Sequence, residues 1–452
     1  MKWAPDPAPL GIDAARRCLE GAIPAIVATC SPDGVPNATY VSQMQYVDHQ
    51  HVALTFQFFN KTRENILANP RATAIVIDPV SAESFRLSLL YLRTETEGAL
   101  FQSMKARLAG IASHVGMAGV FRLQGADVYR VLAVERIAGR PLPAPQPPRN
   151  LLSALRSAGA RLAACTDLDE LFDQVLEVLH AGFGVEHAML LVADEAARSL
   201  YTVASRGYAV SGVGSEIAYG EGVIGVAAEY RTPLRINHMT LEYRYQRAGR
   251  EGTAASAEPM AAEIPFPGLA EPHSQLAVPI LAAGRLVGVL CVESGVDLRF
   301  GYDDEDALVA LSAQLGTALH ALQQQGDAAA VRSAPPAPPA AAAPAVGEVR
   351  HYRANHSVFV DGDYLIKGVA GAILWKLLRD HAETGRTEFS NRELRLAGDL
   401  GLPEVADNLE ARLILLQRRL AERCPRIALC KTGRGQFRLA LPGPLHLVEA
   451  EA

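Results

Sequence analysis

Two proline-rich stretches constrain this chain more than any other feature of its sequence. The first is Arg140–Pro148 (RPLPAPQPP), and the second is Ser333–Val346 (SAPPAPPAAAAPAV). Proline lacks a backbone N–H donor and favours extended polyproline II backbone, so neither stretch can belong to a packed core. The sequence therefore predicts three separately folded modules, at residues 1–143, 150–325 and 347–442, with a semi-rigid Pro/Ala linker at residues 326–346.

The composition is that of an ordinary globular protein. Hydrophobic residues make up 49% of the 452 residues and charged residues 20%, so each module can bury its own core. The formal net charge of −6 excludes a chain that binds polyanions over its whole surface, and any nucleic-acid site must be a local basic patch. The sequence has no secretory signal pattern and no run of 18 or more apolar residues, so we expect a cytoplasmic protein that does not bind membranes.

The sequence offers no recognisable metal site. Six cysteines are spread through the chain without the spacing of a zinc or iron–sulfur site, which predicts reduced thiols that serve as small apolar residues. His49 and His51 form an HxH motif, but they fall in an expected hairpin loop without a third ligand nearby. We therefore predict no metal centre.

The first module reads as a series of short strands. Turn signals such as Pro32-Asp33-Gly34 and Asn69-Pro70 separate segments that are rich in β-branched and aromatic residues. This pattern predicts a closed or half-closed β-barrel. The expected strands cover residues 22–29, 38–47, 51–59, 72–77, 85–96 and 128–137.

A group of polar donors follows the third of these strands. Asn60, Lys61, Thr62 and Arg63 stand where a strand ends and a helix begins. Cations and a hydroxyl group at a helix start are suited to binding a phosphate group. The alternative interpretation is that Lys61 and Arg63 are solvated surface charges.

The first module resembles the pyridoxamine 5′-phosphate oxidase-like split barrels. The matching residues are Ile23–Ala25, Thr29, Asp33–Asn37, Ser42, Leu54–Phe56, Asn60–Thr62, Asn65 and Asn69-Pro70. The resemblance implies a homodimer with FMN at its interface. It assigns the phosphate to Lys61 and Thr62, and the remainder of the cofactor to Tyr40, Val41, Ser42, Thr55 and Gln57, with Arg93 and Glu95 on the strand that closes the site.

Two departures from this family bear on activity. The oxidases usually have two basic residues where Lys61-Thr62 provides one, and the residues that bind the phosphate of their substrate cannot be placed in this sequence. The resemblance thus favours flavin binding over oxidation of pyridoxamine phosphate. A deazaflavin of the F420 type, haem or an empty barrel remain open as alternatives to FMN.

The second module alternates helices and strands and resembles the GAF domain. We expect helices at residues 151–164, 167–181 and 303–322 around an antiparallel sheet. The resemblance rests on Gly220–Gly225 (GEGVIG), Pro233–Ile236, Ser274–Ile280, Gly284–Leu290 and Phe300–Asp304. It implies a small-molecule sensor of unknown ligand, or a domain that binds none.

Two features of the second module bear on its ligand. The irregular stretch between Asn237 and His273 holds basic and aromatic residues that could clamp an anionic or planar ligand, or form a solvated lid: Tyr243, Arg244, Tyr245, Arg247 and Arg250. Cys291 falls in an expected buried strand and is interpreted as a core thiol.

Apolar positions of the last helix, such as Leu308, Leu311 and Leu315, are spaced for one face that would suit a dimer.

The third module begins with an expected hairpin at residues 357–366 that turns at Asp361-Gly362. Ser390 and Glu393 have the spacing of a helix capping box, and a further helix is expected over residues 404–423. A glycine-turned hairpin follows at residues 427–439. Between Arg386 and Arg438 there are 11 Lys or Arg against 7 Asp or Glu, so this module is locally basic within an acidic chain.

This order of elements resembles the winged helix-turn-helix of response regulators, on Leu416–Leu420 and Lys431–Leu439. Gln417 and Phe437 depart from the arginine and tyrosine that the family commonly has there. The resemblance implies DNA binding, with polar side chains of the second helix on its exposed side and basic residues on the wing. The candidate residues are Asn408, Arg412, Arg418, Arg419, Lys431 and Arg434.

The sequence as a whole predicts a multidomain protein: a β split barrel, an α+β GAF domain and a winged helix-turn-helix. The function that fits is a sensor regulator of transcription that responds to a flavin or another small ligand. The alternative is a flavin-dependent oxidoreductase with regulatory domains, and a third possibility is a scaffold of binding modules. No catalytic residue can be assigned from the sequence.

Overall fold

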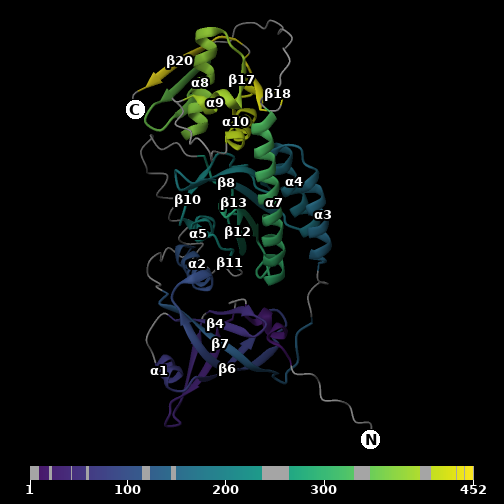
Figure 1. Cartoon of the computed structure of the whole chain (residues 1–452), viewed down its shortest axis with the longest axis vertical. Helices are drawn as coiled ribbons and strands as arrows, with labels where there is room; N and C mark the ends of the chain where they lie inside the picture. The colour runs from purple at the N-terminus through teal and green to yellow at the C-terminus, as the bar shows by residue number, and fades with distance from the viewer. Residues whose placement is uncertain are drawn as a thin grey trace.

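The computed structural model describes residues 10–19, 23–41, 43–56, 61–114, 123–143, 149–236, 264–329, 347–397, 409–433, 435–441 and 443–450. They form three modules in a row (Figure 1). We call them the barrel module (residues 10–143), the central module (149–329) and the C-terminal module (347–450). No helix among the described residues is long and apolar enough to cross a membrane.

The barrel module is one curved seven-stranded sheet in the order β2-β1-β5-β6-β7-β4-β3. The 3₁₀ helix η1 (Ile12–Leu19) packs against it, and helices α1 (Lys61–Ala68) and α2 (Gly98–His114) lie between strands in the chain. The sequence predicts one strand over residues 38–47, where the structure has two strands that are separate in the sheet. The strands are β1 (Ala25–Cys30), β2 (Pro36–Val41), β3 (Met44–Asp48), β4 (His51–Phe56), β5 (Arg71–Ile77), β6 (Ser84–Glu95) and β7 (Gly125–Arg136).

Strand alternation separates the two faces of the barrel sheet. Val52 and Leu54 of β4 point into the barrel core with Tyr129 of β7, whereas Ala53 and Ala126 point outward and are covered by α2. Phe101, Met104 and Leu108 of α2 supply the apolar face of this cover. A helix with an apolar face on one side therefore closes the outside of β4 and β7.

The central module is a six-stranded antiparallel sheet in the order β10-β9-β8-β13-β12-β11 with helices on both faces. Leu190 and Val192 face α3, α4 and α7, whereas Met189 and Leu191 face α5. The strands are β8 (His187–Asp194), β9 (Ser199–Arg206), β10 (Glu216–Ala218), β11 (Leu234–Ile236), β12 (Ser274–Ala282) and β13 (Arg285–Ser294). The helices are α3 (Leu151–Ala164), α4 (Leu168–Phe183), α5 (Gly222–Tyr230) and α7 (Tyr302–Ala329).

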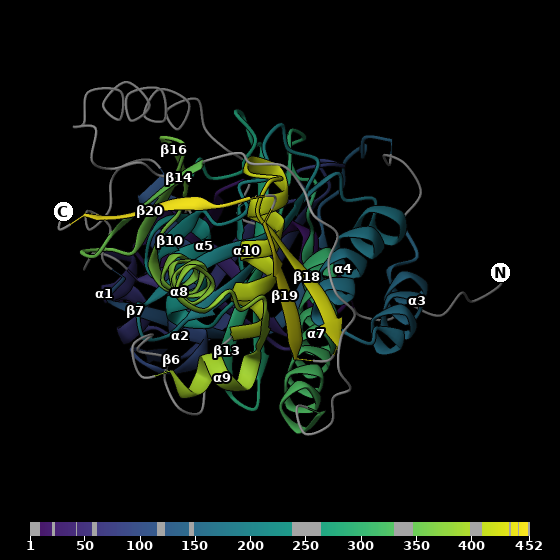
Figure 2. The same cartoon turned by 90° about the horizontal axis from the view of Figure 1, so that it is seen from above.

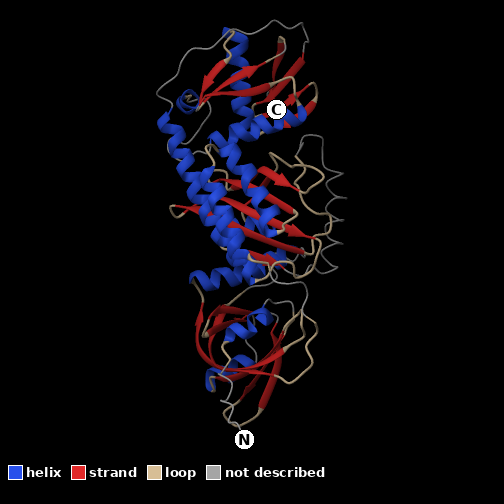
Figure 3. Cartoon of the chain, turned by 90° about the vertical axis from the view of Figure 1, so that its right-hand side faces the viewer, coloured by secondary structure: helices blue, strands red, loops and turns tan. Residues whose placement is uncertain are grey.

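Local signals set the ends of the central helices. Asp167 caps α4 by accepting a hydrogen bond from the Glu170 N–H, and Gly184 ends this helix in the left-handed conformation at φ 60°. Three acidic residues occupy the first turn of α7, as expected for a helix N-terminus. With 28 residues, α7 is about 42 Å long and runs beside the sheet from the barrel toward the C-terminal module (Figures 1 and 3).

The C-terminal module combines two small sheets with three helices. The first sheet has the order β16-β15-β14-β20 and the second β17-β19-β18. The strands are β14 (Gly347–Tyr352), β15 (Ser357–Val360), β16 (Asp363–Ile366), β17 (Glu388–Ser390), β18 (Ala428–Gly433), β19 (Gln436–Ala440) and β20 (Leu445–Ala450). The helices are α8 (Gly368–Thr384), α9 (Asn391–Leu396) and α10 (Leu409–Arg423). In the end view these helices lie beside the two sheets (Figure 2).

Several local predictions for this module are confirmed. Asp361 and Gly362 both have positive φ, 52° and 89°, as a type I′ turn requires. Ser390 accepts a hydrogen bond from the Glu393 N–H, and the Glu393 carboxylate accepts one from the Ser390 N–H. The part of the expected helix before Leu409 lies outside the described residues.

Candidate functional site

The start of α1 holds the residues that the sequence assigns to a phosphate group. Lys61 is exposed, and its Nζ donates to Glu64 Oε2 at 3.2 Å. Thr62 is held on the barrel because its Oγ1 accepts a hydrogen bond from Asn37 Nδ2 of β2 at 2.8 Å. Lys61 and Thr62 thus stand at a helix start beside an edge strand, and each contacts another residue of the barrel module.

Arg63 is neither a phosphate donor nor a solvated surface charge. Its guanidinium group donates to both carboxylate oxygens of Asp127, at 2.5 and 2.6 Å, and to Thr94 Oγ1 at 3.0 Å. It also lies 3.7 Å from the centre of the Phe56 ring. Arg63 therefore anchors the first turn of α1 to β6 and β7, and this fixes the direction in which Lys61 and Thr62 point.

The other candidate cofactor residues of the barrel fall into two groups. On edge strand β2, Tyr40 is 76% exposed and its neighbour Val41 is half-buried, because successive side chains point to opposite faces. Thr55 of β4 and Glu95 of β6 lie on the outer face beside α2, and both are cross-strand neighbours of Ala126 on β7. Arg93 donates to Glu95 Oε1 at 3.0 Å. Ser42 and Gln57 lie outside the described residues.

On the central module, the sheet face that carries α5 has a polar group in its core. Glu293 is buried and accepts hydrogen bonds from Gln275 Nε2 and from the Leu269 N–H. Burial, with Glu293 nearby, raises the pKa of Tyr208 far above its ordinary value. Cys291 is fully buried, and burial raises the pKa of its thiol, so its interpretation as a core residue is confirmed. The expected basic and aromatic clamp at residues 243–250 lies outside the described residues.

Among the described residues, no group of three or more His, Cys, Asp or Glu side chains could hold a metal ion. His51 instead contacts the carboxylate of Asp48, its near neighbour in the hairpin, at 2.9 Å.

In the C-terminal module, the expected exposure of the arginines on α10 is wrong. Arg412 is 6% exposed and donates to Asp194 Oδ2 of the central module at 2.7 Å. Arg418 donates to Asp169 Oδ1 at 2.6 Å and to Asp173 Oδ1 at 2.8 Å, both on α4. The helix periodicity correctly places Arg418 away from the apolar stripe, but the central module rather than water covers that side of α10.

Arg419 and Lys431 have different partners. Arg419 is 4% exposed and donates to the Leu365 carbonyl oxygen at 2.9 Å, so it ties α10 to β16 within the module. Lys431 of β18 donates to Asp167 Oδ2 of the central module at 2.9 Å. Although burial opposes it, the Glu170 N–H and the Lys431 ammonium hold the pKa of Asp167 below its ordinary value. Asn408 and Arg434 lie outside the described residues.

Sequence reasoning missed the acidic half of this contact. Asp167 and Asp169 stand at the start of α4, where acidic residues are common for reasons local to the helix, and Asp173 follows in its second turn. Asp194 ends a strand and holds a turn by accepting from the Ala197 N–H. No sequence signal distinguishes them from ordinary surface acids, because their partners are about 220–260 positions further along the chain.

Two family models match this chain. Residues 12–133 match pyridoxamine 5′-phosphate oxidase, and residues 167–319 match the GAF domain. The comparison with curated proteins gives no match.

Several solved structures are similar to one module of this chain, and three of them come from different kinds of protein. The GAF domain of a phosphoenolpyruvate-protein phosphotransferase from Coxiella burnetii is 20% identical, with 39% of this chain and 97% of that chain covered and a TM-score of 0.31. A free methionine-R-sulfoxide reductase from Neisseria meningitidis is 20% identical, with coverage of 39% and 91% and a TM-score of 0.30. An FMN-binding protein from Syntrophomonas wolfei is 17% identical, with coverage of 27% and 84% and a TM-score of 0.24.

The two family models match the parts of the chain that form the seven-stranded sheet of the barrel module and the six-stranded sheet of the central module. The winged helix at residues 347–442 stays a prediction from the sequence. The chain carries a domain like that of pyridoxamine 5′-phosphate oxidase, followed by a GAF domain.

Proposed function

We propose that this protein is a sensor regulator. Its barrel module binds FMN, its central module senses a small ligand, and its C-terminal module binds DNA as the output. The observation that carries the proposal is that carboxylates of the central module form ion pairs with arginines of both the barrel module and the C-terminal module. Asp303 and Asp306 pair with Arg16 of the barrel module, and Asp169 and Asp173 pair with Arg418 of the C-terminal module. A change in the central module would therefore reach both.

The donors at the start of α1 support the flavin part of this proposal. Lys61 and Thr62 would hold the phosphate group of FMN, while Arg63 keeps the helix start in place. Val41 and Asn37 lie on the same face of β2, so Val41 would line the site next to Thr62. When bound, the flavin would supply a redox-active, light-absorbing ring system.

The order of elements in the C-terminal module supports the DNA part. A hairpin, a helix, a short strand, two helices and a second hairpin follow one another, and the basic residues concentrate on the last helix and the last hairpin. This is the arrangement in which a helix and a wing contact a duplex. The proposed partner is double-stranded DNA, and the proposed oligomer is a homodimer.

Cofactor extraction and an FMN titration test the flavin part. We expect purified protein to release FMN, and Lys61→Gln to weaken FMN binding by roughly tenfold to hundredfold, which is the effect of losing one hydrogen bond to a charged group. Arg71→Gln, at an exposed position on the same barrel, is the matched control and should bind FMN like the wild type. Protein that stays colourless and takes up no FMN would refute this part.

The alternative of a flavin-dependent oxidoreductase makes a different prediction. It requires turnover of a reduced nicotinamide or a pyridoxine-like substrate by the FMN-loaded protein. A regulator instead requires DNA binding that depends on the C-terminal cations. Turnover in the absence of any DNA binding would favour the enzyme.

A further inference from the structure

The helix that carries most of the candidate DNA contacts is buried in this structure. In α10, seven of the eight residues from Leu409 to Leu416 are buried, and Glu410 is half-buried. A helix that enters the major groove must present a free face to base edges and phosphates. α10 has no such face over its first two turns, so this part of the helix cannot contact a duplex in this arrangement.

The covering surface belongs to the central module. Residues of α10 contact α4 and β9, and the apolar core on the α4 face of the central sheet continues without a break into that of the C-terminal module. Leu415 lies against the backbone of Gly214, within about 4 Å of the position where a Cβ atom would stand. The Lys367 ammonium adds a pair with Glu216 at 3.6 Å.

The polar part of this contact matches what DNA would offer. Arg412, Arg418 and Lys431 each meet aspartate oxygens at 2.6–2.9 Å. Guanidinium and ammonium groups bind carboxylate and phosphate oxygens by the same charge-assisted hydrogen bonds. Asp167, Asp169, Asp173 and Asp194 thus offer these cations the same kind of acceptor oxygens that DNA phosphates would offer.

The contact also has features of one that can separate. A cavity of about 210 Å³ lies between the two modules, lined by Asp167 and Asp169 on one side and Leu413, Ile414 and Phe437 on the other. Asp169 and Asp173 are 48% and 67% exposed, so water and salt reach these pairs.

We propose that the basic face of the C-terminal module, formed by Arg412, Arg418 and Lys431, binds either the central module or double-stranded DNA, but not both. This inference rests on the proposed function, and it adds that the structure is the closed form, in which DNA binding is blocked. In the open form the C-terminal module would remain joined to the central module by the chain between Ala329 and Gly347. The apparent DNA affinity is then reduced by the fraction of closed molecules.

Two variants of the full chain test the closed form. Asp169→Asn/Asp173→Asn removes both carboxylates from Arg418 while keeping side-chain size, and Arg418→Glu turns the attraction into repulsion. Asp303→Asn/Asp306→Asn is the matched control, because it removes two charges from the same central module at the other junction. Hydrogen exchange of the α10 backbone measures opening, and exchange of barrel strands checks that the fold is unchanged.

Fluorescence anisotropy with a labelled duplex of random sequence measures DNA binding. Asp169→Asn/Asp173→Asn should speed α10 exchange and raise DNA affinity by about tenfold over the control, with affinity falling as salt is added. Arg418→Glu should also speed exchange but gain no affinity, because it lacks the cation. This combination supports the proposal.

Three results would overturn it, and they separate it from the proposed function. If neither variant speeds α10 exchange, the contact is permanent and the closed form has no open counterpart. If wild type, variant and control bind the duplex equally, DNA binding stands but the central module does not block it. If α10 opens and no form binds the duplex, both the blocked site and the DNA-binding function fail.

Discussion

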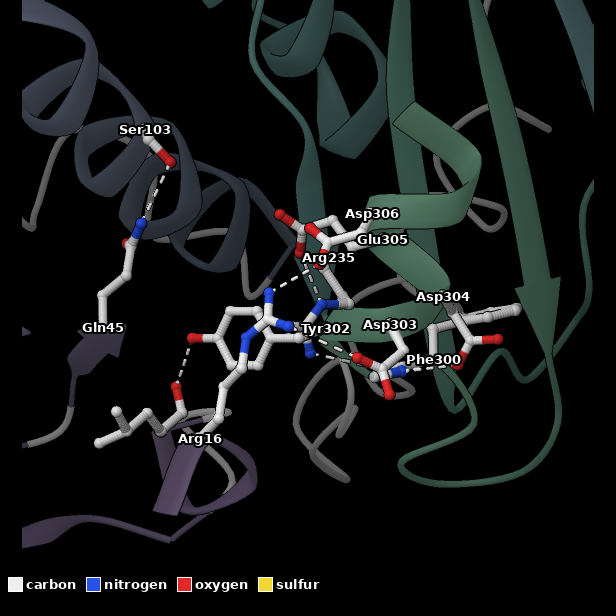
Figure 4. Close-up of polar contacts among 12 residues, drawn as sticks. Arg16, Gln45, Ser103, Arg235, Phe300, Tyr302, Asp303, Asp304, Glu305 and Asp306 are labelled. Carbon is white, nitrogen blue, oxygen red and sulfur yellow. Dashed lines mark hydrogen bonds and ion pairs between the residues drawn. The ribbon is translucent and has the colours of Figure 1, made fainter. Parts of the chain in front are cut away.

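The central module meets its two neighbours in different ways. At the barrel, Tyr302 reaches into the neighbouring core, where its hydroxyl donates to the Leu19 carbonyl oxygen at 2.8 Å and the Arg16 guanidinium lies 4.8 Å from its ring centre (Figure 4). Arg235 stacks on the same ring at 4.4 Å. Beside this point, Asp303 and Asp306 are 86% and 63% exposed. This part of the barrel junction therefore combines one buried anchor with solvated charges.

At the C-terminal junction, by contrast, the apolar cores of the two modules form one cluster. The ion pair between Arg412 and Asp194 is nearly buried, with 7% and 17% of the side chains exposed. Removing one partner from a buried ion pair destabilises a protein far more than removing one partner from an exposed pair. The comparison teaches that similar Arg–Asp pairs can be buried against an apolar core at one junction and solvated at the other.

The largest effect is expected from Asp194→Asn. The amide keeps the size of the side chain and can still accept from the Ala197 N–H, but Arg412 loses its nearby carboxylate. Removing one partner of a buried pair costs about 3–5 kcal/mol. Calorimetry should show the C-terminal module unfolding at lower temperature while the barrel transition stays in place. A loss of less than about 1 kcal/mol would put this pair in the same class as the exposed ones.

The second-largest effect is expected at Tyr302, whose side chain anchors the central module to the barrel core. Tyr302→Phe keeps the ring between Arg16 and Arg235 but leaves the buried Leu19 carbonyl oxygen without this donor. We expect a loss of about 1–3 kcal/mol in the stability of the barrel junction, measured by hydrogen exchange of η1. Faster exchange in α10 rather than in η1 would contradict the assignment of Tyr302 to the barrel core.

A pH change should affect the C-terminal module before the barrel module. Burial, and then His356, lowers the pKa of His351 below its ordinary 6.5, although Glu449 opposes this. The unfolded chain therefore binds this proton first, so the C-terminal module loses stability as the pH falls below 6.5. Thermal unfolding at about pH 7.5 and about pH 5.5 measures the loss, and His351→Gln should abolish it.

The barrel module provides the reference for that experiment. Although burial opposes it, hydrogen bonds from Gln50 and His51 lower the pKa of Asp48 below its ordinary 3.8. The stability that this carboxylate contributes is present above pH 3.8 and is lost only at still lower pH. An equal loss in both modules at about pH 5.5 would show that His351 is not responsible.

The smallest effect is expected from Asp303→Asn. Its carboxylate is 86% exposed and lies 3.4 Å from Arg16, which also pairs with Asp306 at 2.8 Å. Exposed pairs of this kind contribute about 0–1 kcal/mol and weaken with salt. Calorimetry should detect almost no change, and a shift as large as that of Asp194→Asn would contradict the contrast between the junctions.

Much of the fold could be predicted from the sequence because it depends on local patterns. The proline-rich stretches separate the modules, the Ser390–Glu393 capping box starts α9, and Asp361-Gly362 turns a hairpin. Each of these signals acts within a few residues of the chain. The split of the strand predicted at residues 38–47 into β2 and β3 was missed, because nothing in its composition marks the break.

The candidate sites show where such patterns stop being sufficient. For Lys61 and Thr62, the sequence indicates both the chemistry and the place at a helix start. It indicates nothing of the pair between Arg63 and Asp127, which are 64 positions apart. For Arg412 and Arg418, helix periodicity sets them apart from the apolar stripe, but it cannot tell water from a second module.

The sequence by itself determined local features: the Ser390–Glu393 capping box, the Asp361-Gly362 turn and which residues carry positive charge. Only the tertiary structure decided that Arg63 points into the barrel and that α10 packs on α4 rather than facing solvent. The physical reason is that propensity, capping and periodicity act over a few neighbouring residues. Charge pairing and burial depend instead on surfaces that meet only after the chain has folded.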